Sequence, residues 1–97
     1  MEELLSAVKS YLNIDWDEDD TKIEGYINRG TAYLNRIAGK TLDFTVEDLP
    51  RQLLLDYCRY ASSQALEVFA TNFQGELIEL NLDSQEVADE DQNTDGV

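Results

Sequence analysis

The residues best suited to chemistry are the acids of one short segment. Five carboxylates fall within six positions: Asp15, Asp17, Glu18, Asp19 and Asp20. The alternation of the first aspartates is that of the opening ligands of an EF-hand calcium loop. The rest of the pattern fails, because the sixth loop position is Asp20 instead of glycine, the eighth is Lys22 and the twelfth is Tyr26 instead of glutamate. We therefore expect no metal site and interpret the segment as the solvated start of a helix.

Residue types that carry catalysis are scarce in the rest of the chain. The sequence has no histidine, which removes the commonest general base and a common metal ligand. The five glycines are scattered and form no phosphate-binding loop. Cys58 is the only cysteine and has apolar neighbours, so we interpret it as a small buried hydrophobe. We expect a protein that is not an enzyme and has no cofactor.

The charge balance and the lack of a long apolar run argue against further classes of protein, such as DNA-binding and membrane-spanning proteins. The 97 residues carry 21 acids and 7 bases, a net charge of −14, which repels the DNA backbone and argues against a DNA-gripping module. No apolar run approaches the length that spans a bilayer, and the acidic start Met1–Glu3 is unlike a signal peptide. Eight of the acids and no base lie between Glu76 and Val97. We expect 84–97 to be a disordered acidic tail, which either stays solvated or folds on a neighbouring subunit.

Hydrophobic periodicity predicts an all-α fold, a small bundle of three main helices over about residues 3–12, 18–38 and 46–73. Asp20 is the expected N-cap of the second helix, with Asp17 as the alternative. Gly39 suits the left-handed residue after that helix. Gly30 at mid-helix costs about 1 kcal/mol relative to alanine. We expect a close helix crossing at Gly30 to offset this cost.

The predicted third helix is unusually apolar. Thr45–Asp48 resembles a capping box, and Pro50 falls in the first turn, where its missing N–H does no harm. Apolar positions cover more than one face, so the helix is expected to form the core and also to contact a partner. Residues 76–82 are expected to form a fourth short helix or an extension of the third, although their alternation also fits a strand. The division is a helical domain, 1–83, and the tail, 84–97.

Aromatic and apolar residues near these faces are candidates for an interface. Trp16 stands among charges, so it either folds back onto the second helix or is exposed for a partner. The candidate interface residues are Trp16, Tyr57, Tyr60, Phe73, Leu77, Ile78, Leu80 and Leu82.

The order of these segments resembles a known family. The chain runs from "VKSYLNID" through the acidic "DEDD" and "IEGYINRGTAYLNRIAGK" to "LPRQLLLDYCRYASSQALEVF". This is similar to the head–tail connector (adaptor, or DNA-packaging completion) proteins of tailed bacteriophages and prophages, over about residues 4–75. It departs at Gly30, where the family more often has alanine. The matching positions are Leu5, Val8, Lys9, Tyr11, Leu12, Ile14, Asp15, Asp19, Asp20, Ile23, Ile27, Tyr33 and Gly39.

The resemblance implies a structural virion protein located at the head–tail interface and assembled in the bacterial host cytoplasm. It implies a homo-oligomeric ring below the portal protein that extends the DNA channel and offers a docking surface to a tail-completion protein. DNA passes nearby without specific binding, and no membrane is involved. On this reading Asp15, Asp17, Glu18, Asp19 and Asp20 are candidates to face the lumen or the portal. The alternative is a small acidic regulator or DNA mimic that binds a DNA-binding protein.

Overall fold

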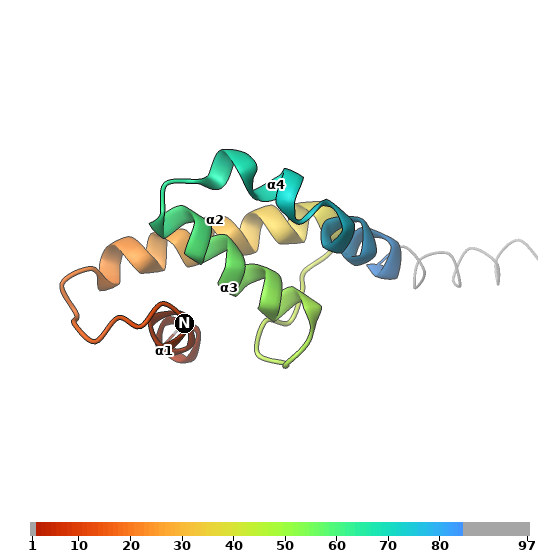
Figure 1. The fold of residues 1–97 in the computed structure, drawn as a ribbon. Helices are drawn as coiled ribbons and strands as arrows, with labels where there is room; N and C mark the ends of the chain where they lie inside the picture. Colours follow the sequence, from red (N-terminus) through yellow and green to blue (C-terminus); the bar gives the residue numbers. More distant parts are fainter. Residues whose placement is uncertain (1, 85–97) are drawn as a thin grey trace, which may run out of the picture.

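The computed structural model describes residues 2–84, and all regular structure in this part is helical, which confirms the predicted fold class (Figure 1). In Figure 1, α2 runs behind α3, with α1 below and the η1–α4 segment above. Residues 74–84 are also helical and lie near the end of α2. The bounds of the elements named above are α1 (Glu2–Tyr11), α2 (Asp20–Ala38), α3 (Leu49–Ser62), the 3₁₀ helix η1 (Leu66–Val68) and α4 (Phe69–Asn72).

The connection between α1 and α2 corrects one prediction. The helix α2 begins at Asp20, and the residue before it is Asp19, whose side chain forms no capping hydrogen bond. Neither Asp20 nor Asp17 is the cap, because both carboxylates pair with Lys9. The Asp19 carboxylate accepts a hydrogen bond from Trp16 instead of from the α2 backbone. At the far end Gly39 takes the predicted left-handed conformation, with φ of 74°.

The predicted close crossing at Gly30 is confirmed. A Cβ atom built on Gly30 would lie 2.8 Å from Leu54 Cδ1 and 2.8 Å from Tyr57 Cδ1, so α3 packs directly on the α2 backbone. Ile27 and Leu34 flank this point and are fully buried. The crossing of α2 and α3 is therefore the centre of the hydrophobic core.

The third helix is shorter than predicted and does not run unbroken from 46 to 73. It begins at Leu49, because Asp48 rather than Thr45 supplies the cap, and it ends at Ser62. Gln64 then adopts a left-handed conformation with φ of 57°. The turn brings the Phe69 ring to 5.5 Å from the Tyr57 ring. In one continuous helix these residues, twelve positions apart, would be about 18 Å apart along the axis.

Residues 74–84 confirm the predicted helix around 76–82 and exclude the strand. Leu77, Leu80 and Ser84 face inward, and the Asn81 amide donates to the Ile37 carbonyl at the end of α2 over 2.9 Å. This bond satisfies one of the carbonyls that a helix end leaves without a partner. Of the predicted acidic tail, Ser84 is the last described residue, and 85–97 lie outside the described residues.

The close crossing at Gly30 predicts that alanine substitutions at two glycines of α2 change the free energy of unfolding in opposite directions. Gly30→Ala should lower the free energy of unfolding by about 1–3 kcal/mol, because the new methyl overlaps Leu54 and Tyr57. Gly25→Ala is the matched control and should raise it by up to about 1 kcal/mol, because only Arg29 Nη1, at 3.6 Å, is near its added Cβ. Urea unfolding measures both, and a Gly30→Ala variant as stable as Gly25→Ala would contradict the crossing.

Candidate functional site

The acidic segment before α2 is organised around Lys9 of α1. Its ammonium donates to Asp17 Oδ1 over 2.6 Å and lies 2.8 Å from Asp20 Oδ1, an ion pair without a hydrogen bond. The two carboxylates, Asp17 first, raise the pKa of Lys9. This cation ties the end of the segment to the first helix, so two of the five acids are ion-paired within the subunit, and a third, Asp19, accepts a hydrogen bond from Trp16. Asp15 and Glu18 are exposed and form no ion pair with the described residues.

Trp16 combines the two readings weighed from its sequence position. Its indole N–H donates to Asp19 Oδ2 over 2.9 Å, which fixes the ring beside the start of α2. The side chain is nevertheless 47% exposed. Together with Tyr11 and Arg59 it lines a surface cavity of about 470 Å³ between the acidic segment and the end of α3.

The structure divides the candidate interface residues into two groups. Tyr57, Leu77 and Leu80 are buried in the subunit core, and Tyr60 and Phe73 are half-buried in an aromatic cluster around Phe69. Trp16, Ile78 and Leu82 are about half exposed, at 47%, 51% and 52%. This second group presents the larger exposed apolar surface, and its contact with a partner stays a prediction. Among residues 2–84 no set of three metal-binding side chains lies close enough to hold an ion.

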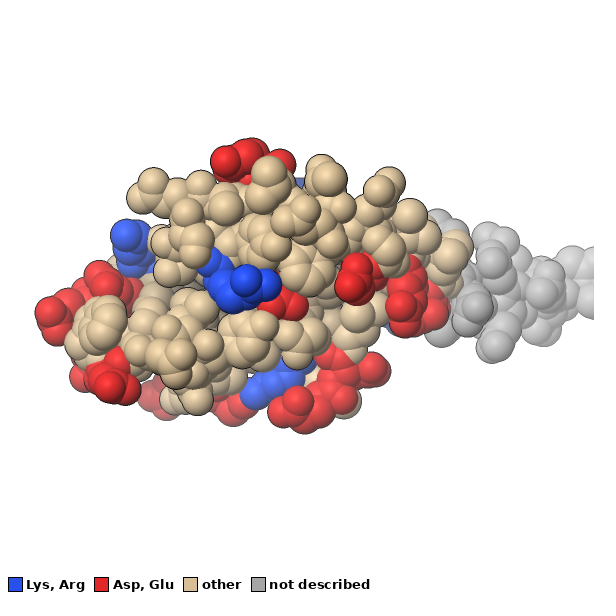
Figure 2. Space-filling model, viewed as in Figure 1, with Lys and Arg blue, Asp and Glu red and all other residues tan. Residues whose placement is uncertain are grey.

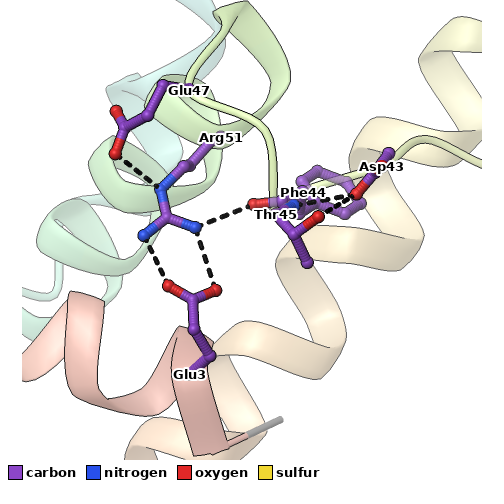
Figure 3. A network of polar contacts seen from close by, with 6 residues as sticks. All are labelled: Glu3, Asp43, Phe44, Thr45, Glu47 and Arg51. Carbon is purple, nitrogen blue, oxygen red and sulfur yellow. Dashed lines mark hydrogen bonds and ion pairs between the residues drawn. The ribbon is translucent and has the colours of Figure 1, made fainter.

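Arg51 forms a polar clamp that the sequence did not indicate (Figure 3). Its guanidinium donates twice to the Glu3 carboxylate, over 2.8 and 3.1 Å, and once to the Phe44 carbonyl over 3.1 Å. Glu47 Oε1 lies 3.6 Å from Nε. The clamp joins α1, the α2–α3 loop and α3 through one side chain that is only 8% exposed. A bidentate arginine–carboxylate pair is the strongest common form of ion pair.

A second polar network also joins α3 to α1. Asp56 is buried and accepts hydrogen bonds from Tyr11 of α1 and from Gln52, and Arg59 lies 3.4 Å away. The bond to Asp56 is the main reason why the pKa of Tyr11 is raised. Cys58, also on α3, is fully buried, as predicted, and burial raises the pKa of its thiol to about 12. A thiol so protected is inert.

The cations that remain are concentrated on α2. Lys9, Arg51 and Arg59 are ion-paired within the subunit. Lys22, Arg29, Arg36 and Lys40 are all exposed and form no ion pair with a described acid. Elsewhere, the face seen in Figure 2 carries acidic side chains over several elements, including the end formed by residues 74–84.

These features define a small all-helical protein with polar clamps between its helices and with charged and apolar residues on its surface. A family model described as phage gp6-like head-tail connector protein matches residues 2–76. The chain therefore belongs to the phage gp6-like head–tail connector family and is a structural component of the phage virion. The alternative of an acidic regulator or DNA mimic is not favoured by this match.

The other comparisons found nothing: no curated protein and no solved structure matches the chain. None of the helices in the described range 2–84 has the length and apolar character needed to cross a bilayer.

The clamp at Arg51 predicts an acid-sensitive contribution to stability. Glu3→Gln should lower the melting temperature at pH 7 by a few degrees, because the hydrogen bonds from Arg51 to the carboxylate are lost. These hydrogen bonds hold the pKa of Glu3 below its ordinary value of 4.5. The folded state therefore binds this proton less tightly than the unfolded state does. The contribution is complete above pH 4.5 and is lost as the pH falls through the lower pKa of the folded state.

Thermal unfolding of Glu3→Gln and the wild type from pH 7 to pH 3 measures this effect. Glu2→Gln is the matched control, because Glu2 is exposed and forms no ion pair with the described residues. The gap between wild type and Glu3→Gln should close in acid, and a gap that stays constant down to pH 3 would contradict the assignment.

Proposed function

We propose that the chain is a subunit of a ring below the portal protein, where it extends the DNA channel and provides the surface on which the tail docks. The observation that carries this proposal is the match of residues 2–76 to the head–tail connector family. The ring is assembled in the cytoplasm of the bacterial host and becomes part of the virion. Its partners are further copies of the chain, the portal protein and a tail-completion protein.

Surface chemistry supports this role. Exposed Trp16, Ile78 and Leu82 offer apolar contact area to partners, and aromatic side chains are enriched at such contacts. A net charge of −14 keeps DNA from adhering to a ring through which it passes. Asp15 and Glu18, which have no partner among the described residues, are the acids of the segment best suited to face the lumen or the portal. Asp17, Asp19 and Asp20 also serve the fold.

A complementation experiment tests the function. A phage whose gene for this chain is deleted should accumulate DNA-filled heads and free tails, because the junction between them is missing. Adding the purified wild-type chain to such an extract should restore joined particles, counted by electron microscopy and plaque assay. Complete infectious particles in the deletion strain would overturn the proposal.

The same extract tests the acidic segment. Asp15→Asn combined with Glu18→Gln should lower the yield of joined, infectious particles at least several-fold while leaving the fold intact. Glu2→Gln combined with Glu67→Gln is the control, because both double variants change the net charge from −14 to −12 on exposed residues. Equal yields from the two double variants would contradict a lumen or portal role of the segment.

A further inference from the structure

One face of α2 has features that the folded subunit does not use. Lys22, Gly25, Arg29, Ala32 and Arg36 follow one another at spacings of three and four residues, so they form a single stripe along the helix. The stripe lies about 160° around the helix from the core positions Ile23 to Ala38. It is about 21 Å long from Lys22 to Arg36. We call it the basic stripe.

Its charges are unpaired in an otherwise acidic protein. Lys22, Arg29 and Arg36 are exposed and form no ion pair with an acid of residues 2–84, although the chain has three acids for every base. The guanidinium of Arg29 lies over the Tyr26 ring, 5.6 Å from its centroid, and donates no hydrogen bond to a carboxylate of residues 2–84. A run of cations that neighbouring acids do not neutralise indicates a partner of opposite charge.

Gly25 gives independent evidence of a contact at the same place. Unlike Gly30, Gly25 is not required by packing within the subunit, because the one atom near an added Cβ is the flexible end of the Arg29 side chain. Glycine at mid-helix is unfavourable relative to alanine. Ala32, seven residues further on, is also small and is exposed, whereas Gly25 is half-buried. Two small residues between three cations let another helix approach the α2 backbone closely.

A surface of complementary pattern is present on the same chain. Glu76, Glu79 and Asp83 are exposed on the helix 74–84, at spacings of three and four residues, and have no ion-pair partner in the described part. In the sequence this spacing of acids continues at Glu86 and Glu90. We call Glu76, Glu79 and Asp83 the acidic row.

Apolar residues adjoin the acidic row on the same helix. Ile78 and Leu82 are each about half exposed, at 51% and 52%. Ile78 also lines an open cavity of about 580 Å³ with Ile37 and Leu77, next to the end of α2. The helix thus offers an apolar centre with a charged border, the usual composition of a protein interface.

We propose that the basic stripe of one copy packs against the acidic row of the next copy and forms the contact between neighbouring subunits. The two surfaces differ, so the contact is head-to-tail and repeats from copy to copy, as ring assembly requires. Matching spacings of three and four residues suit two helices that cross at a shallow angle of about 20°. This inference rests on the proposed ring and adds to it the surfaces that would build the ring.

Charge reversal with rescue tests the pairing. Arg29→Glu/Arg36→Glu makes the stripe acidic, and Glu76→Lys/Glu79→Lys makes the row basic, so each variant alone repels its own copies. In an equimolar mixture, every contact between a copy of one variant and a copy of the other pairs a stripe with a row of opposite sign. Sedimentation velocity and native mass spectrometry should show oligomers of the wild type, at least a tenfold loss of association for each variant, and recovery in the mixture.

Two further variants separate association from folding and from net charge. Gly25→Gln should fold with a melting temperature at least that of the wild type, yet lose association, because the long side chain blocks the approach. Arg29→Gln/Arg36→Gln should associate less than Ser6→Glu/Ser10→Glu, although both double variants change the net charge from −14 to −16. Ser6 and Ser10 are exposed on α1, a helix that carries neither of the two surfaces.

Three outcomes would overturn the proposal. The first is a charge-reversed variant that associates like the wild type, or a mixture without recovery. The second is a wild-type chain that stays monomeric at millimolar concentration. The third is binding of a 20-base-pair duplex that Arg29→Glu/Arg36→Glu abolishes while self-association persists, which would assign the stripe to nucleic acid. Restoration of joined particles by the wild-type chain in the deletion extract is a separate readout, so the ring function can stand where this contact fails.

Discussion

The packing of α3 on the bare backbone of Gly30 is the contact on which the rest of the subunit depends. It brings Tyr57 close to α2, and the ring of Tyr57 in turn receives Phe69 after the chain has turned at Gln64. The helix 74–84 continues from this aromatic cluster and returns to the end of α2. One small residue therefore sets the spacing of the central helix pair, and the later elements are built on that spacing.

Charged clamps complete a core that is small. A ten-residue helix is marginal in isolation, so α1 needs fixed contacts to the rest of the subunit. It has them through Lys9, Arg51 and the Tyr11–Asp56 bond, in addition to buried Val8. These clamps occupy the cations of α1 and α3. The other four bases, Lys22, Arg29, Arg36 and Lys40, lie on α2 or just after it and are exposed.

Sequence patterns were sufficient for the features that are local. The extents of α1 and α2 follow from helical periodicity, and Gly39 and Gly30 were identified by what glycine alone permits. The break after Ser62 has no glycine or proline to mark it. The break accompanies the ring contact between Tyr57 and Phe69, and no local pattern in the sequence indicates that contact. The Arg51 clamp joins residues 48 positions apart, so no local spacing indicates it.

The prediction of which residues lie on the surface was limited in the same way, because burial depends on contacts between residues far apart in the sequence. Leu77 and Leu80 are as apolar as Ile78 and Leu82, and only the rotation of the helix about its axis decides which of them are buried. The basic stripe, by contrast, is a local pattern of α2. Its proposed role as a contact surface depends on the structure, which shows which cations are already paired within the subunit. In the ring that we propose on the basis of the family match, copies of this chain would stand side by side.

The most direct test of the whole account is an electron cryo-microscopy reconstruction of the head–tail junction of the intact virion. The account predicts a closed ring of copies of this chain between portal and tail, with α2 of each copy against residues 74–84 of the next. A junction without this chain, or copies that do not touch one another, would contradict it.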